Sequence, residues 1–171
     1  MNKESAVSEK INPVRETDDE AIALASRLIS ETEYAALAVS ETGTQVPLVS
    51  RIAAAWSNET GLFFCASDLS VHSKCLLENA TCSLMLGEPG KGDGLAYPRI
   101  TIIGTAERLP NNADQRQSLR LQFLAIHPKA ELYVDFADFG FYPIKVERAQ
   151  LNGGFGKAYH LNSTDLAFIG G

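Results

Sequence analysis

The apolar residues of this chain fall into short runs that are separated by turn-forming residues. Runs of this kind, bounded by Gly, Pro, Asn, Asp and Ser, are typical of β-strands. The sequence predicts six strands, at Tyr34–Ser40, Gln45–Trp56, Leu62–Ala66, Thr81–Leu86, Arg99–Leu109 and Phe141–Leu151. The links between the first three strands are only a few residues long, so we expect an antiparallel meander there.

Other segments show the three-to-four-residue apolar spacing of an amphipathic helix. The first follows Thr17-Asp18-Asp19-Glu20, a capping box in which the Thr17 hydroxyl is expected to cap a helix that ends near Glu31. Three more helical segments are predicted: a short helix capped by Ser67 or Asp68, a stretch from Pro110 to Ile126, and a short helix at Ala130–Asp135. His127-Pro128 separates the last two, because the residue before a proline avoids the helical conformation.

These elements predict a mainly β fold, a six-stranded antiparallel split β-barrel with helices packed outside it. Residues 1–16 are polar and without periodicity, and we expect a flexible N-terminal arm there. The barrel domain is assigned to residues 17–160 and a C-terminal tail to residues 161–171. Within the domain, Gly153-Gly154-Phe155-Gly156 is expected to form a glycine loop that ends the last strand.

The composition limits which partners and which cellular environment we expect for this chain. The chain has 171 residues, 15 Lys and Arg against 21 Asp and Glu, and a formal net charge of -6, which disfavours binding to nucleic acid. Its three cysteines form no CxxC pair, so reduced thiols in a cytoplasmic protein are expected. The first residues contain no apolar leader segment, and no apolar run is long enough to cross a bilayer, so no membrane association is expected.

The candidate chemistry is limited to groups that could hold a phosphate. The sequence has no HExxH, GxSxG or GxxxxGK[ST] motif, and no protein-bound metal site is predicted. Hydroxyl and cationic side chains do stand near strand ends and a helix start, and these are the groups that a phosphate recruits: Ser50, Arg51, Ser70, His72, Lys74 and Arg99. From the residues alone, surface charges and helix-capping serines explain the same set.

Four stretches carry a family resemblance. The segment from Ser67 to Leu86, which contains Ser70-Val71-His72-Ser73-Lys74, resembles the flavin-binding split-barrel proteins related to pyridoxamine 5′-phosphate oxidase. The later stretches Pro98–Gly104, Tyr133–Tyr142 and Gly153–Ala158 look like the subgroup that includes heme-utilisation proteins. The likeness spans about residues 20 to 160.

The resemblance implies a homodimer that holds flavin mononucleotide (FMN) in a groove between its subunits. Carried over by position, the FMN contacts would be Ser50, Arg51, Ser70, His72, Lys74 and Arg99. Many relatives have Lys where this chain has His72. The implied function is that of a flavin-dependent oxidoreductase acting on a small-molecule substrate, with the cofactor carrying the chemistry.

Two departures open alternatives. The C-terminal residues 163–171 lack the Arg-containing motif and terminal Pro of pyridoxamine 5′-phosphate oxidase itself, so oxidation of vitamin B6 is not expected. The first alternative is a heme-binding or heme-degrading protein that uses the same dimer groove, with His160 as the candidate iron ligand. The second is a barrel that dimerises without any cofactor.

Overall fold

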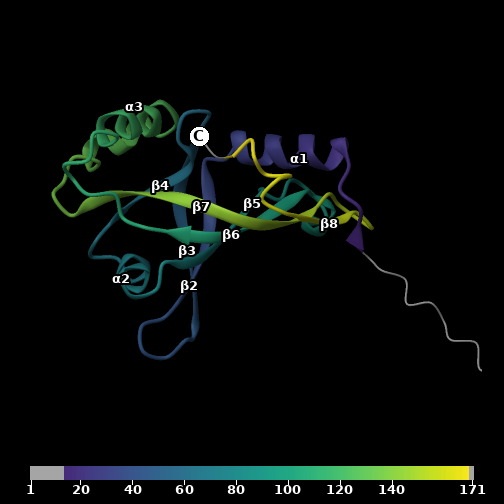
Figure 1. Cartoon of the computed structure of the whole chain (residues 1–171), viewed down its shortest axis with the longest axis horizontal. Coiled ribbons are helices and arrows are strands. Elements are labelled where there is room, and N and C mark those ends of the chain that lie inside the picture. Colours follow the sequence, from purple (N-terminus) through teal and green to yellow (C-terminus); the bar gives the residue numbers. More distant parts are fainter. Residues whose placement is uncertain (1–13, 170–171) are drawn as a thin grey trace, which may run out of the picture.

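Six antiparallel strands form a closed barrel in the computed structural model, which describes residues 14–169. They are β2 (Tyr34–Ser40), β3 (Pro47–Ser57), β4 (Gly61–Ser67), β5 (Thr81–Leu86), β6 (Arg99–Ala106) and β7 (Phe139–Asn152). They lie in the order β7-β4-β3-β2-β5-β6, and pairing of β6 with β7 closes the barrel (Figure 1). The predicted mainly β, six-stranded antiparallel barrel is therefore confirmed.

Two short strands extend the sheet beyond the barrel. β8 (Ala158–Leu161) pairs antiparallel with β7, and β1 (Val14–Arg15) pairs parallel with β8. Neither strand was expected from the sequence. The predicted N-terminal arm lies mostly outside the described residues, and the predicted domain boundaries stay predictions. Beyond β8 the chain returns to the barrel, where Leu166 and Ile169 are buried in the core.

The buried side chains form two apolar clusters, and β3, β4 and β7 contribute to both. Side chains such as Leu37, Leu84 and Ile102 fill the barrel interior. β4 is buried on both faces, because Leu62, Phe64 and Ala66 point inward while Phe63 and Cys65 point outward into a second cluster. This double burial explains why the sequence of β4 is apolar throughout rather than alternating.

Helix α3 (Arg116–Ile126) covers that second cluster on the outside of the barrel wall (Figure 1). Its Leu119 and Phe123 pack with Phe63 and Phe141. The helix begins later than predicted, because the chain from Pro110 makes hydrogen-bonded turns before it. The short 3-10 helix η2 (Pro128–Leu132) follows, where an α-helix was predicted at Ala130–Asp135.

The caps of the other two helices differ by one to three residues from the expectation. Helix α1 (Asp19–Ser30) is capped by Asp18 rather than Thr17, since the Asp18 Oδ1 accepts a hydrogen bond from the Ala21 N–H at 2.8 Å. Helix α2 (Val71–Glu78) is capped by Ser70 rather than by Ser67 or Asp68. α1 packs on the interior cluster through Ala21, Ala25 and Ile29.

Candidate functional site

The six predicted phosphate contacts do not converge on one place within a single chain. Only two of them are in contact through their side chains: the Ser50 Oγ on β3 and the His72 Nδ1 on α2 lie 3.1 Å apart. The inward orientation of Ser50 follows from its pairing with the buried Leu37 on β2. The contact joins the β2–β3 hairpin to the start of α2.

The second ring nitrogen of His72 is enclosed by protein. Its Nε2 is buried and has no hydrogen-bond partner among the described residues. Burial also lowers the pKa of the His72 imidazole below its ordinary value of 6.5, so the ring is neutral at pH 7. A neutral imidazole supplies no positive charge to a phosphate and could meet one only through a hydrogen bond.

Three further candidates are engaged or positioned elsewhere. The Ser70 Oγ caps α2 and donates to the Ser67 backbone oxygen at 2.8 Å. Lys74 lies in a separate groove of about 530 Å³ between α2 and the β2–β3 turn, with Glu41 and Glu78 on its lining. Arg51 is exposed on the outer face of the barrel, because it alternates with the inward-pointing Ile52.

Arg99 and His160 share a groove on the opposite part of the sheet. This groove of about 220 Å³ is bounded by β6, β7 and β8, and its lining also includes Thr101, Gln150 and Asn152. The Arg99 Nη1 donates only to two backbone oxygens, those of Leu95 at 3.3 Å and Tyr97 at 3.4 Å. Among residues 14–169, no carboxylate pairs with Arg99, and no group hydrogen-bonds the ring of the exposed His160.

The groove is continuous with the outer face of the barrel. Strand register places Ala36, Met85, Thr101, Gln150 and His160 in one cross-strand row on five successive strands. Residues in register point to the same side of a sheet. Met85 in this row and Val49 beside it are large apolar side chains exposed on the same face, 45% and 63% accessible respectively. The same face also carries the exposed Arg51, which pairs with Ala36, so the surface beside the groove combines apolar and cationic side chains.

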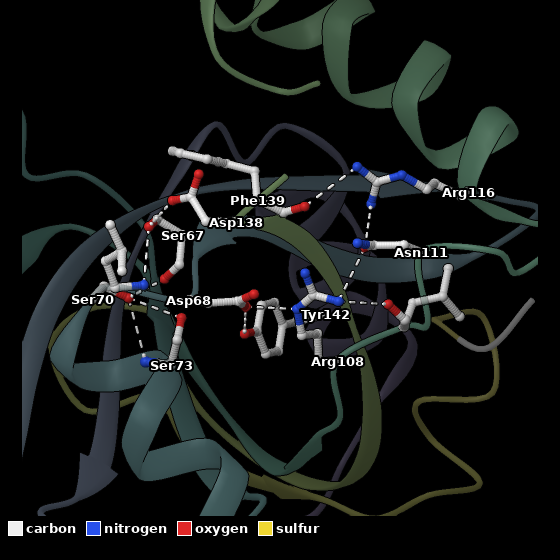
Figure 2. A network of polar contacts seen from close by, with 12 residues as sticks. Ser67, Asp68, Ser70, Ser73, Arg108, Asn111, Arg116, Asp138, Phe139 and Tyr142 are labelled. Atoms are coloured by element: carbon white, nitrogen blue, oxygen red, sulfur yellow. Dashed lines mark hydrogen bonds and ion pairs between the residues drawn. The ribbon is translucent and has the colours of Figure 1, made fainter. Parts of the chain in front are cut away.

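A polar network that the sequence did not reveal joins the starts of α2 and α3 to β7 (Figure 2). The Arg108 Nε donates to the Asp68 Oδ1 at 2.6 Å, and the Tyr142 hydroxyl donates to the same oxygen at 3.5 Å. The Asn111 Oδ1 accepts from both Arg108 and Arg116, at 3.1 and 3.4 Å. The one available signal in the sequence was that charged residues stand where apolar strands end, Asp68 directly after β4 and Arg108 two residues after β6.

The charged side chains of this network are partly buried from solvent. Only 17% of the Arg108 side chain and 37% of the Asp68 side chain are accessible. Burial raises the pKa of the Tyr142 hydroxyl above its ordinary value of 10.0, so it stays protonated at neutral pH and can donate to Asp68. Ser67 in turn donates to the Asp138 carboxylate. Each charged group except Arg116 faces an opposite charge or hydroxyl donor, and the network is suited to holding the barrel end together.

The cysteines offer no reactive thiol. Cys65, Cys75 and Cys82 are buried and unpaired. Burial raises the pKa of the Cys65 thiol and of the Cys82 thiol to about 12, so both stay protonated at neutral pH. Within residues 14–169, no three His, Cys, Asp or Glu side chains gather to hold a metal ion.

Comparison with known families matches residues 16–166 to the model described as "CREG, beta-barrel". The chain belongs to the CREG beta-barrel family.

Relatives of this CREG beta-barrel chain include heme proteins. It is 40% identical over 94 residues to the chloroplastic non-canonical heme oxygenase HOZ of Arabidopsis thaliana, a match that covers 54% of this chain and 27% of that protein. It is 25% identical to the solved structure of a heme-binding protein from Mycobacterium smegmatis, with a TM-score of 0.78, over 88% of this chain and 61% of that one. This CREG beta-barrel chain thus spans only part of the length of either relative.

A third comparison concerns the fold alone. A protein of the pyridoxinephosphate oxidase family from Clostridium acetobutylicum, related to general stress protein 26, is 12% identical, with a TM-score of 0.67, over 88% of this chain and 99% of that one. The predicted likeness to split-barrel proteins of this kind is therefore confirmed at the level of fold. Binding of FMN by this CREG beta-barrel chain stays a prediction. Within the described residues, no helix combines the length and apolar character needed to cross a membrane.

Proposed function

We propose that this chain binds heme in the groove between β6, β7 and β8, and that it acts in heme use or degradation. The observation that carries the proposal is the pairing, in one groove, of an exposed imidazole with a guanidinium that has no carboxylate partner among the described residues: His160 and Arg99. An imidazole nitrogen is a common iron ligand, and arginine binds carboxylates such as the propionates of heme.

The donor set of the groove fits this group. The ring nitrogens of His160 are not used by the described chain, and the Arg99 guanidinium is positioned by the two backbone oxygens it contacts. When bound, heme would supply a redox-active iron. His160 would hold that iron on one side, while Arg99 would anchor the acidic edge of the ring. Thr101 and Gln150 would line the floor between them.

The groove of one chain is small for this ligand, which favours a homodimer. Its volume of about 220 Å³ lies below the ~300–1,000 Å³ of typical small-molecule sites. The apolar outer face around Val49 and Met85 borders the same cross-strand row. A second copy seated on that face would cover the open side of the groove, in agreement with the dimer that the sequence resemblance implies.

The relatives support heme over flavin. Two of the proteins to which the chain is similar are named for heme. The flavin hypothesis takes Ser50, Arg51, Ser70, His72, Lys74 and Arg99 as FMN contacts in a groove between two subunits, and within one chain only the side chains of Ser50 and His72 are in contact. FMN binding stays a prediction that the same experiment tests.

Hemin titration of the purified protein tests the proposal. We expect a Soret band at an equimolar end point, a changed band and weaker binding for His160→Ala, and about 10- to 150-fold weaker binding for Arg99→Ala, from the loss of a charge-assisted contact. Lys74→Ala, in the separate groove, is the matched control and should bind as the wild type does. Addition of a reductant then distinguishes degradation, in which the Soret band is lost, from storage.

Two results would contradict the proposal. One is a protein that takes up FMN to an equimolar end point and leaves hemin free. The other is a hemin spectrum and affinity that neither His160→Ala nor Arg99→Ala alters.

A further inference from the structure

Phe155 is the most exposed large apolar side chain among the described residues. It is fully exposed at the tip of the turn between β7 and β8. A second exposed apolar residue, Leu95, is 72% accessible on the 3-10 helix η1 (Gly94–Ala96) in the β5–β6 connection. Two large apolar side chains, Phe155 on the β7–β8 turn and Leu95 on the β5–β6 connection, are therefore exposed to solvent.

The turn presents Phe155 in a fixed position. The Gly153 N–H donates to the Lys157 oxygen at 2.7 Å, and the Lys157 N–H donates to the Gly154 oxygen at 3.2 Å. Gly154 and Gly156 have φ values of +106° and +72°, which favour glycine and define the bend on both sides of the ring. A turn held in this way loses little conformational entropy when its aromatic ring meets a ligand.

The loops that carry Phe155 and Leu95 both adjoin the Arg99–His160 groove. Asn152 and Ala158, which line the groove, are the paired residues from which the turn starts. The Leu95 oxygen accepts a hydrogen bond from Arg99 at 3.3 Å. The two loops also meet, since a Cβ on Gly154 would lie 3.0 Å from the Ala96 oxygen.

We propose that Phe155, together with Leu95, forms an apolar wall that extends this groove and selects ligands with a flat apolar ring beside a carboxylate. The inference rests on the proposed function and adds the residues that recognise the macrocycle itself, independently of the iron. Arg99 takes the acidic edge of the tetrapyrrole, and Phe155 covers part of the ring that the groove is too small to enclose. Aromatic faces pack well on such rings.

The test compares hemin with metal-free protoporphyrin IX, which offers the same ring and carboxylates without an iron. Phe155→Ala should weaken binding of both ligands by about 5- to 50-fold, from the loss of one aromatic contact. His160→Ala should weaken binding of hemin alone. Phe155→Trp should bind both ligands as the wild type does, and Phe136→Ala, which removes a 57% exposed phenylalanine elsewhere, is the matched control.

The outcomes distinguish failure of the heme proposal from failure of the proposed role of Phe155. If the wild-type protein binds neither ligand, the proposed function fails. If it binds both and Phe155→Ala leaves both affinities unchanged, the heme proposal stands and the role of Phe155 is wrong. A Phe155→Ala protein that changes its mass by light scattering before any ligand is added would show a contact between protein subunits instead, and would also overturn the inference.

Discussion

At the scale of single residues, the contact between Ser50 and His72 depends on how α2 packs against the β2–β3 hairpin. Periodicity says which face a residue occupies and nothing about its partner on another element. Arg99 and His160 were assigned to different cofactors on the basis of resemblance, and only the pairing of β6, β7 and β8 places them in one groove.

His72 gives the protein a measurable sensitivity to acid. Because burial lowers the pKa of its imidazole below 6.5, the unfolded chain binds this proton more readily than the folded one. The stability contribution is therefore complete above pH 6.5 and is lost as the pH falls through 6.5 toward the lower folded pKa. We expect the free energy of unfolding, from urea titrations at pH 7.5 and pH 5.5, to fall less in His72→Gln than in the wild type.

The matched control is His160→Gln, because the His160 side chain is exposed. That variant should retain the full pH dependence of the wild type. An identical pH dependence in wild type and His72→Gln would show that the buried imidazole does not titrate in this range.

At the scale of elements, the strongly periodic segments were predicted best. The apolar runs located all six barrel strands, and the apolar seam located α3 through Leu119 and Phe123. The start of α3 could not be placed, because Pro110–Gln115 form local turns that periodicity does not distinguish from a helix. β8 was missed, since four residues after a glycine turn form a strand only through their pairing with β7.

The Asp68–Arg108 pair should matter more to these elements than an ion pair at the surface. Asp68→Ala leaves the mostly buried Arg108 guanidinium without its carboxylate, and we expect a loss of about 1–3 kcal/mol in the free energy of unfolding. Asp135→Ala is the control, because the Arg120–Asp135 pair has comparable geometry but an exposed carboxylate, and it should change stability much less. Equal losses in urea-unfolding experiments would show that the network of Figure 2 is energetically a surface feature.

At the scale of the whole molecule, closure of the barrel followed from the sequence because every strand has one apolar face that must be covered. The oligomeric state did not, since an outward-pointing Val or Met has the same sequence signature whether water or another chain covers it. Strand register now gathers Val49, Ala36, Ala38 and Met85 on one outer face. The homodimer stays a prediction, and this face is the surface on which we test it.

Introducing charge on that surface tests the dimer. Met85→Glu places a carboxylate at the centre of the outer face, and we expect it to convert a dimer into a monomer at micromolar concentration because the charge would lose its hydration in the interface. Light scattering coupled to size exclusion gives the mass directly. Leu121→Glu, on an exposed position of α3, serves as the control. A wild-type protein that already elutes as a monomer contradicts the dimer.

The short parallel pairing of β1 with β8 has an effect that reaches beyond its two residues. Val14 and Arg15 sit against Ala158 and Tyr159, and the Thr17 hydroxyl donates to the His160 oxygen across 143 positions of sequence. Residues 14–17 thus hold the backbone beside His160, the residue proposed to bind the iron, in place. Proteolysis just before Asp18 would leave the six barrel strands complete but would remove these contacts to β8. A far-ultraviolet circular dichroism spectrum like that of the intact protein would therefore not show that His160 is still correctly placed.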